Sequence, residues 1–203
     1  MIDKNQIQKD EKWSHKDYYP FYYKGLRVEQ NRNIFNALDK LSELCQPNQI
    51  IEIGASNGGF TKILEDHEIS QNAKIYSIEL TDSNATAFYS EKVKKIKGNC
   101  FELENEIGNL ISNDGISLVF CDGGNKNLEI NSFAKYLKIG DFIFGHDYAP
   151  THDFWKENFN GKVWDWHETW DSAIDETCIK HNLKPFLYED FLNAVWKSLK
   201  KVK

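Results

Sequence analysis

The chain has 203 residues, a length that fits one domain with a sizeable core. Apolar residues make up 40% and charged residues 28%, as in ordinary soluble proteins, and no apolar run is long enough to span a membrane. The net charge of −6 argues against a dedicated nucleic-acid-binding protein, because such proteins carry a basic domain or stripe.

The cysteines and the N-terminus indicate the compartment. The four cysteines include no C-x-x-C pair and lie among apolar residues, which favours reduced thiols. The first residues are polar and mixed in charge, unlike a signal peptide. We therefore expect a cytoplasmic protein that acts neither on nucleic acid nor at a membrane.

Residues 1–30 are polar and then aromatic around Pro20. We expect this segment to be an arm or lid that packs on a single domain spanning 1–203, or that covers a pocket in it. Its aromatic residues are Trp13, Tyr18, Tyr19, Phe21, Tyr22 and Tyr23.

After the arm, apolar periodicity predicts helices that alternate with strands. Helices are expected at 29–45, 58–67, 83–92, 101–112 and 126–137, and strands at 49–53, 74–78, 93–96, 116–121 and 141–145. This alternation predicts an α/β fold with a doubly wound, mostly parallel sheet. A Trp-rich irregular stretch at 148–166 follows, then a helix at 169–182 and two last strands at 186–188 and 192–199.

A glycine-rich turn, G-A-S-N-G-G at 54–59, joins the first central strand to the next helix. Such a turn lets a ligand approach bare backbone at a helix N-terminus, although glycines can also serve tight packing alone. Glu79 ends the following strand, where its carboxylate can accept hydrogen bonds from a ribose. Ser56 stands where dinucleotide-binding proteins have the glycine beside the pyrophosphate. The pattern therefore favours a nucleoside without pyrophosphate, such as S-adenosylmethionine.

Four motifs occur in order: the turn with its preceding Glu52, the acid Glu79, F-C-D-G-G at 120–124 and G-H-D-Y at 145–148. Together they resemble class I S-adenosylmethionine-dependent methyltransferases, above all the branch of cephalosporin-hydroxylase-like and macrolide-sugar O-methyltransferases. That branch begins with a G-hydrophobic-x-x-Q element, which G-L-R-V-E-Q at 25–30 echoes. The resemblance covers about residues 25–150 and implies a Rossmann-like methyltransferase fold.

The resemblance also implies a reaction, which is methyl transfer to an oxygen of a small-molecule acceptor such as a sugar or secondary metabolite. The turn would surround the methionine end, Glu79 would hold the ribose, and Asn99 and Cys100 would lie beside the adenine. The implied cofactor-binding residues are Glu52, Gly54, Ala55, Ser56, Gly58, Gly59, Glu79, Asn99, Cys100 and Asp122. The segment 148–170 would lie on the acceptor side, where its tryptophans either wall the acceptor pocket or close the domain as a flap. A homo-oligomer is possible.

The reacting end would be formed by Asp122, His146 and Asp147, each placed directly after a predicted strand. Metal-dependent relatives use an acid at the first position and two adjacent groups at the second to bind magnesium, which activates the acceptor hydroxyl. His146 departs from that pattern, because imidazole suits transition metals better than magnesium. Three alternatives stay open: magnesium on Asp122 and Asp147, a transition metal that also uses His146, or no metal and His146 as general base.

Lys126 is a second candidate base. A related branch has a lysine three residues after this acid, whereas here the offset is four, and a lysine at a helix start is usually solvated. Two further pairs, His152-Asp153 and His167-Glu168, either form a second metal site or lie on the surface. The alternative functions are a non-catalytic nucleoside-binding partner subunit and a nicotinamide-dependent oxidoreductase.

Overall fold

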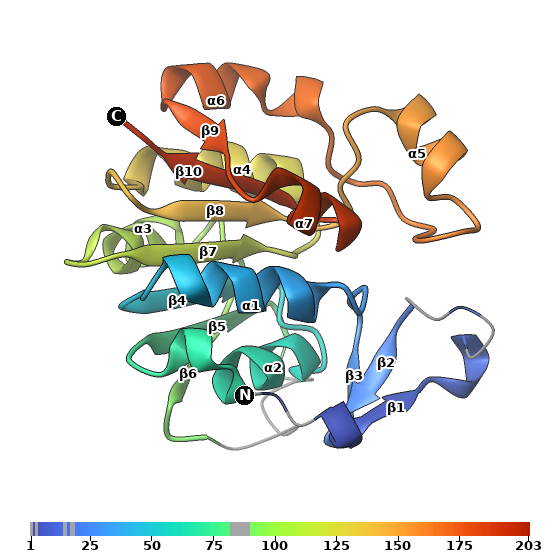
Figure 1. Ribbon diagram of the computed structural model, residues 1–203. Helices are drawn as coiled ribbons and strands as arrows, with labels where there is room; N and C mark the ends of the chain where they lie inside the picture. The colour runs from blue at the N-terminus through green and yellow to red at the C-terminus, as the bar shows by residue number, and fades with distance from the viewer. Residues whose placement is uncertain (1, 3, 14–15, 17–18, 82–89) are drawn as a thin grey trace.

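A seven-stranded sheet forms the centre of the protein in the computed structural model, which describes residues 2, 4–13, 16, 19–81 and 90–203. Its strands are β4 (Gln49–Ile53), β5 (Lys74–Glu79), β6 (Val93–Lys97), β7 (Ser117–Cys121), β8 (Phe142–Gly145), β9 (Leu183–Pro185) and β10 (Lys197–Lys201). They lie in the order β6-β5-β4-β7-β8-β10-β9 (Figure 1). The first five are parallel, and β10 is antiparallel to both of its neighbours. The predicted doubly wound, mostly parallel sheet is confirmed.

Helices cover both faces of this sheet. The helices are α1 (Ile34–Leu44), α2 (Gly59–Asp66), α3 (Glu104–Ser112), α4 (Lys126–Phe133), α5 (His152–Asn158), α6 (Asp175–Lys180) and α7 (Tyr188–Asn193). Helices α1, α2 and α7 pack on one face, and α3, α4 and α6 on the other (Figure 1). In β4, Ile50 belongs to one apolar core and Ile51 to the opposite one, since alternate side chains of a strand point to opposite faces. Every residue of β4 and β7 is buried, as expected for a doubly covered parallel sheet.

The carboxyl ends of the central strands meet at one edge of the sheet. Ile53 pairs with both Ile78 and Cys121, and Cys121 pairs with Gly145, so the residues that follow these positions are brought together. The chain runs outward from β4 through β5 to β6 and then returns to β7 on the other side of β4. Ligands of open α/β sheets bind at this kind of reversal point.

The N-terminal arm forms a small antiparallel sheet of its own, made of β1 (Ile7–Lys9), β2 (Phe21–Tyr23) and β3 (Leu26–Val28). Phe21 and Tyr23 are buried in the core with residues of α1 and α2, so this part of the arm packs on the domain. The arm and α5 lie at right in Figure 1, beside the carboxyl edge of the main sheet. Tyr18 falls outside the described residues.

The last third of the chain departs from the sequence prediction. The predicted strand 186–188 is wrong, because β9 ends at Pro185 and α7 begins at Tyr188 with Phe191 buried against Phe144. The predicted irregular stretch contains α5, whose N-terminus is capped by the Thr151 side chain. The predicted helix 169–182 is shortened to a 3-10 turn at 171–173 and α6. Most of the predicted helix 83–92 lies outside the described residues.

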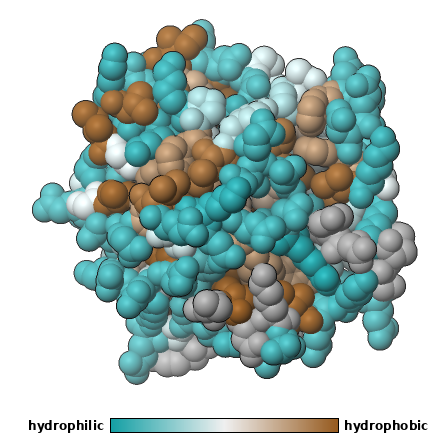
Figure 2. Space-filling view, viewed as in Figure 1, coloured by the Kyte–Doolittle hydropathy of each residue, from teal (hydrophilic) through white to brown (hydrophobic). Residues whose placement is uncertain are grey.

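The visible surface is mixed in character. The face shown in Figure 2 is mainly hydrophilic, with apolar side chains in small groups between polar ones. Among the described residues, no helix combines the length and apolar character needed to cross a membrane.

Candidate active site

The glycine-rich turn holds the ends of β4 and β7 close together. Gly54 has a φ of +85°, and a Cβ at this position would lie 2.3 Å from the backbone oxygen of Asp122. Only glycine fits there, since a side chain would be both strained and in collision. Gly59 has a different constraint, because a Cβ there would lie 2.1 Å from the backbone oxygen of Arg27 in the arm. Both glycines therefore have packing reasons that hold with or without a ligand.

Glu79 lies at the end of β5, beside this turn. Its Oε2 accepts a hydrogen bond from the Ser56 backbone N–H at 2.9 Å, and its Oε1 accepts one from the Leu80 N–H at 2.9 Å. These bonds hold the carboxylate at the carboxyl edge of the sheet, where we predict that a ribose binds.

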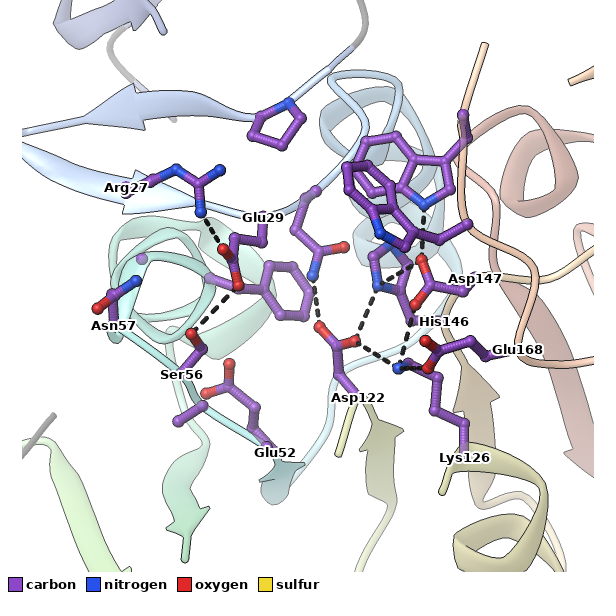
Figure 3. Close-up of a pocket in the computed structure, with 18 residues that line it drawn as sticks. Arg27, Glu29, Glu52, Ser56, Asn57, Asp122, Lys126, His146, Asp147 and Glu168 are labelled. Atoms are coloured by element: carbon purple, nitrogen blue, oxygen red, sulfur yellow. Dashed lines mark hydrogen bonds and ion pairs between the residues drawn. The ribbon is translucent and has the colours of Figure 1, made fainter. Parts of the chain in front are cut away.

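Two cavities adjoin at this edge. The first, of about 350 Å³, is lined by Glu79, Asn99, Cys100 and neighbouring residues. The second, of about 260 Å³, runs from the turn to the ends of β7 and β8 (Figure 3). Both linings include Gly54, Ser56 and Asp122, so the cavities meet there.

The predicted cofactor residues divide between these cavities. Glu52, Ala55 and Gly59 line the 260 Å³ cavity only, and Glu79, Asn99 and Cys100 the 350 Å³ cavity only. Gly58 lines neither of them and stands at the N-cap of α2. All of the predicted cofactor residues except Gly58 therefore line these two adjoining cavities. Their contacts with a cofactor remain a prediction.

Glu52 is a buried acid beneath the second cavity. Burial raises its pKa to about 8, although the Thr61 hydroxyl donates a hydrogen bond to its Oε2 at 2.5 Å and opposes the rise. An acid with a raised pKa keeps its proton in the folded state at a pH where the unfolded chain has lost it. Glu52 therefore disfavours folding increasingly as the pH rises.

This gives a stability prediction. The free energy of unfolding should fall as the pH rises from the ordinary value of 4.5 towards the folded-state value of about 8. Glu52→Gln should reduce that fall, because a neutral amide has no proton to lose. Urea unfolding across this pH window checks it, with Glu43→Gln, an exposed glutamate on α1, as control. Identical pH dependence in wild type and Glu52→Gln would contradict the prediction.

Asp122 and His146 form a hydrogen-bonded pair at the ends of β7 and β8. His146 Nδ1 lies 2.8 Å from Asp122 Oδ1. The other oxygen, Oδ2, accepts a hydrogen bond from Gln30 Nε2 at 2.6 Å, and Gln30 Oε1 accepts one from Trp196 Nε1 at 2.9 Å. The chain of bonds from Trp196 through Gln30 fixes the carboxylate, and the carboxylate fixes the imidazole.

The His146 ring is buried and stacks on Trp196, with ring centroids 4.7 Å apart. Burial alone would lower the pKa of His146, but the negative charges of Asp122 and Asp147 outweigh it and raise the pKa. The Nε2 atom is buried and has no hydrogen-bond partner among the described residues. The imidazole is thus oriented through the contact of its Nδ1 with Asp122.

Asp147 adopts a left-handed backbone conformation, with φ +53°, that is uncommon for a residue other than glycine. Its Oδ1 accepts a hydrogen bond from Trp164 Nε1 at 2.6 Å, and its Oδ2 lies 3.1 Å from Lys126 Nζ. Burial would raise the pKa of Asp147, but the cations His146 and Lys126 lower it. Asp147 is therefore a buried, ionised carboxylate with fixed partners.

Lys126 is buried, contrary to the expectation of a solvated side chain. Its Nζ lies 2.7 Å from Glu168 Oε2 and 3.9 Å from Asp122 Oδ1 (Figure 3). It also lies 3.1 Å from the Gly123 backbone oxygen. Burial would lower the pKa of Lys126, but the surrounding carboxylates raise it. The side chain stays protonated, which argues against its predicted role as a base.

The outer wall of the second cavity comes from two distant segments. The arm contributes Pro20 and Arg27, and the 148–170 segment contributes Trp164 and Trp166. Trp164 is buried, whereas Trp166 is 38% exposed. The tryptophans of this stretch were expected either to wall a pocket or to close the domain as a flap. The position of Trp164 and Trp166 in the cavity lining favours a pocket wall.

The two pairs His152-Asp153 and His167-Glu168 do not come together as a second metal site among the described residues. His152 and His167 lie with their Nδ1 atoms 3.3 Å apart, but Glu168 turns instead to Lys126. Within the described ranges, the one group of three potential ligands is Asp122, His146 and Asp147, with donor atoms within 4.8 Å of one another.

Sequence reasoning missed three residues of this site. Gln30 was noticed only as part of a motif, although it holds Asp122. Trp196 falls in a predicted strand, and Glu168 is predicted only as part of a possible second metal site or of the surface, whereas it pairs with Lys126. All three act through partners far away in sequence, which the pattern of a single chain does not reveal.

Comparisons with known proteins identify a family and a shared fold. The family model of FtsJ-like methyltransferases matches residues 29–144. The apo structure of CmcI has a TM-score of 0.66 at 15% identity and covers 100% of this chain and 88% of its own. A CmcI structure with Mg and SAM gives 0.65 at 16% identity, covering 100% and 89%.

MycE, a methyltransferase from the mycinamycin biosynthetic pathway, is more distant. Its complex with Mg, SAH and mycinamycin VI gives a TM-score of 0.54 at 12% identity and covers 84% of this chain and 48% of its own, so this chain spans about half of MycE. A comparison with curated protein sequences gives no significant match. At these identities the structures show a shared fold, while the family model covers more than half of the sequence. The chain belongs to the FtsJ-like methyltransferase family.

Proposed function

We propose that this protein transfers the methyl group of S-adenosylmethionine to an oxygen of a small-molecule acceptor. The observation that carries the proposal is the pair of adjoining cavities, which lead from Glu79 past the glycine turn to the Asp122–His146 pair. CmcI with Mg and SAM, and MycE with Mg, SAH and mycinamycin VI, share the fold and support the same ligand class.

The cofactor would lie across both cavities. The adenine would contact Asn99 and Cys100, the ribose hydroxyls would donate to Glu79, and the methionine end would pass Gly54 and Ser56. The sulfonium methyl would then face the cavity that contains His146. This placement uses the reversal point of the sheet, where such ligands bind.

His146 would act as the general base. In its neutral form, Nδ1–H donates to Asp122 and Nε2 accepts the proton of the acceptor hydroxyl. As that proton moves to Nε2, the oxygen forms a bond to the methyl carbon and the carbon–sulfur bond breaks, which yields a methyl ether and S-adenosylhomocysteine. The raised pKa makes the neutral imidazole a stronger base, and the fixed geometry supplies proximity.

The magnesium ion stays a prediction, and the observed side-chain contacts disfavour its binding. Asp122 Oδ1 contacts His146, and Asp147 Oδ2 contacts Lys126. An ammonium therefore already stands among the acids, and imidazole is a poor ligand for magnesium. The residues do not fit a divalent cation together with Lys126, and no step above uses one.

The acceptor would enter between the arm and the 148–170 segment. Trp164, Trp166 and Pro20 provide flat or rigid apolar surface, and Arg27 and Glu29 provide charged groups beside it. Amphipathic rings of this kind suit sugars and phenols. We therefore propose a hydroxylated ring as the acceptor.

Incubation with S-adenosylmethionine carrying a ¹³C-labelled methyl group, against a panel of sugars and phenols, tests the function. The expected result is a labelled methyl ether, identified by NMR. Tight cofactor binding without turnover on any acceptor would favour the non-catalytic partner subunit. Thermal stabilisation by NAD but not by S-adenosylmethionine would favour an oxidoreductase.

The role of Glu79 is tested by replacing it with alanine. The affinity for S-adenosylhomocysteine should fall by about 1.5–3 kcal/mol, the range for hydrogen bonds to a charged group. Calorimetry measures the change, with Glu43→Ala on α1 as control and with melting curves to check the turn that Glu79 also holds. Unchanged affinity in a folded variant would show that the ribose binds elsewhere.

A further inference from the structure

We propose that the Lys126 ammonium takes the place of a divalent metal in this site and that the protein therefore needs none. The consequence for catalysis rests on the proposed methyl transfer. The placement of the cation does not, because it follows from contacts within the chain alone.

The ammonium is fully engaged. It lies 2.7 Å from Glu168 Oε2, 3.1 Å from Asp147 Oδ2 and 3.1 Å from the Gly123 backbone oxygen. A lysine has three N–H donors, and each of them has an oxygen within reach. With only 5% of the residue exposed, Lys126 is part of the built site and not a surface side chain that happens to bend inward.

The position of Lys126 in the chain explains how it reaches this place. It is the first residue of α4, four residues after Asp122, and the intervening turn is held by Glu129. Glu129 accepts hydrogen bonds from the Gly123 and Asn125 N–H groups at 3.1 and 3.2 Å. The turn therefore directs the lysine stem back towards the carboxyl edge of the sheet.

Lys126 already supplies positive charge to the acids of this cluster. Buried carboxylates need cationic partners, and Lys126 Nζ lies 3.1 Å from Asp147 Oδ2. A divalent ion among the same oxygens would stand beside a protonated lysine and be repelled by it. Lys126 would have to leave three acceptors before such an ion could bind.

The other carboxylate oxygens of Asp122 and Asp147 are also occupied by hydrogen bonds within the chain. Asp122 Oδ2 accepts from Gln30, and Asp147 Oδ1 accepts from Trp164. Magnesium requires several oxygen ligands in a near-octahedral arrangement. Because these oxygens already accept hydrogen bonds within the chain, few ligands are left for the ion. Lys126 also lines the 260 Å³ cavity, where its charge can stabilise negative charge developing on an acceptor oxygen.

Manganese binding tests the inference without any turnover, because Mn²⁺ added to the purified full chain can be followed by its EPR signal. Wild type should leave millimolar Mn²⁺ free, and Lys126→Met should gain affinity by about tenfold or more, since the repelling charge is gone. Lys126→Arg should still exclude the ion. Lys135→Met, at an exposed lysine, is the matched control and should behave as wild type.

Two results would overturn the inference. One is tight Mn²⁺ binding by wild type that Asp122→Asn abolishes. The other is a Lys126→Met variant, folded by circular dichroism, that binds Mn²⁺ no better than wild type. If that variant does not fold, Lys126→Gln replaces it under the same criteria. Failure to find an acceptor would count against the proposed function and leave these binding results standing.

Discussion

Replacing His146 with alanine should lower the rate of methyl transfer by about 10²–10⁴-fold, the usual contribution of a positioned general base. Affinity for S-adenosylhomocysteine should change little, because His146 lies at the reacting end and Glu79 at the nucleoside end. Single-turnover rates with a labelled cofactor, together with calorimetry, separate the two effects.

Two further variants sharpen this test. His146→Gln keeps a polar side chain of similar reach but no basic nitrogen, so it should be as slow as the alanine variant. His181→Ala, at a histidine that ends α6 and lines neither cavity, is the control and should keep the wild-type rate. A His146→Ala rate within tenfold of wild type would remove His146 from the chemistry.

Replacing Gly54 with alanine should destabilise the protein by about 2–5 kcal/mol. The left-handed φ of +85° costs a side chain about 1–2 kcal/mol, and overpacking adds about 1–3 kcal/mol. The added Cβ would lie 2.3 Å from the backbone oxygen of Asp122, so β4 and β7 must move apart. Urea unfolding measures the loss.

Gly140 provides a matched control for this prediction. It has a similar φ of +96°, but a Cβ there would meet nothing within 4 Å. Gly140→Ala should therefore show only the conformational cost, about 1–2 kcal/mol. Equal losses for the two variants would mean that the close approach of β4 and β7 is unimportant.

The central sheet could be predicted because its signals are local. The strands β4 and β7 are buried and mainly apolar, Gly54 follows β4, and Glu79 ends β5 at the edge where ligands of such sheets bind. Asp122 and His146 are brought together by the parallel register alone. These features depend on spacing along the chain, which the sequence displays.

The end of the chain could not be predicted in the same way. Tyr188–Asn193 is a short segment whose apolar residues suit a strand or a helix, and packing of Phe191 on the sheet decides for the helix. Short apolar runs are ambiguous between the two structures. Helix α5 is hidden for a similar reason, since it buries none of its residues and shows no apolar stripe.

The burial of Lys126 could not be predicted from the sequence for a different reason. Its burial depends on Glu168, which lies 42 positions further along the chain and follows no recognised motif. A lysine at a helix start is solvated unless such a distant partner closes over it. The three-dimensional neighbourhood, and not the local pattern, turns a candidate base into a fixed cation.

A crystal structure with S-adenosylhomocysteine tests the central claim most directly. We expect the ribose hydroxyls on Glu79, the adenine beside Asn99 and Cys100, and the sulfur at the junction of the two cavities, directed towards His146. A nucleoside bound outside these cavities, or a sulfur directed away from the Asp122–His146 pair, would contradict the proposed methyl transfer at this site.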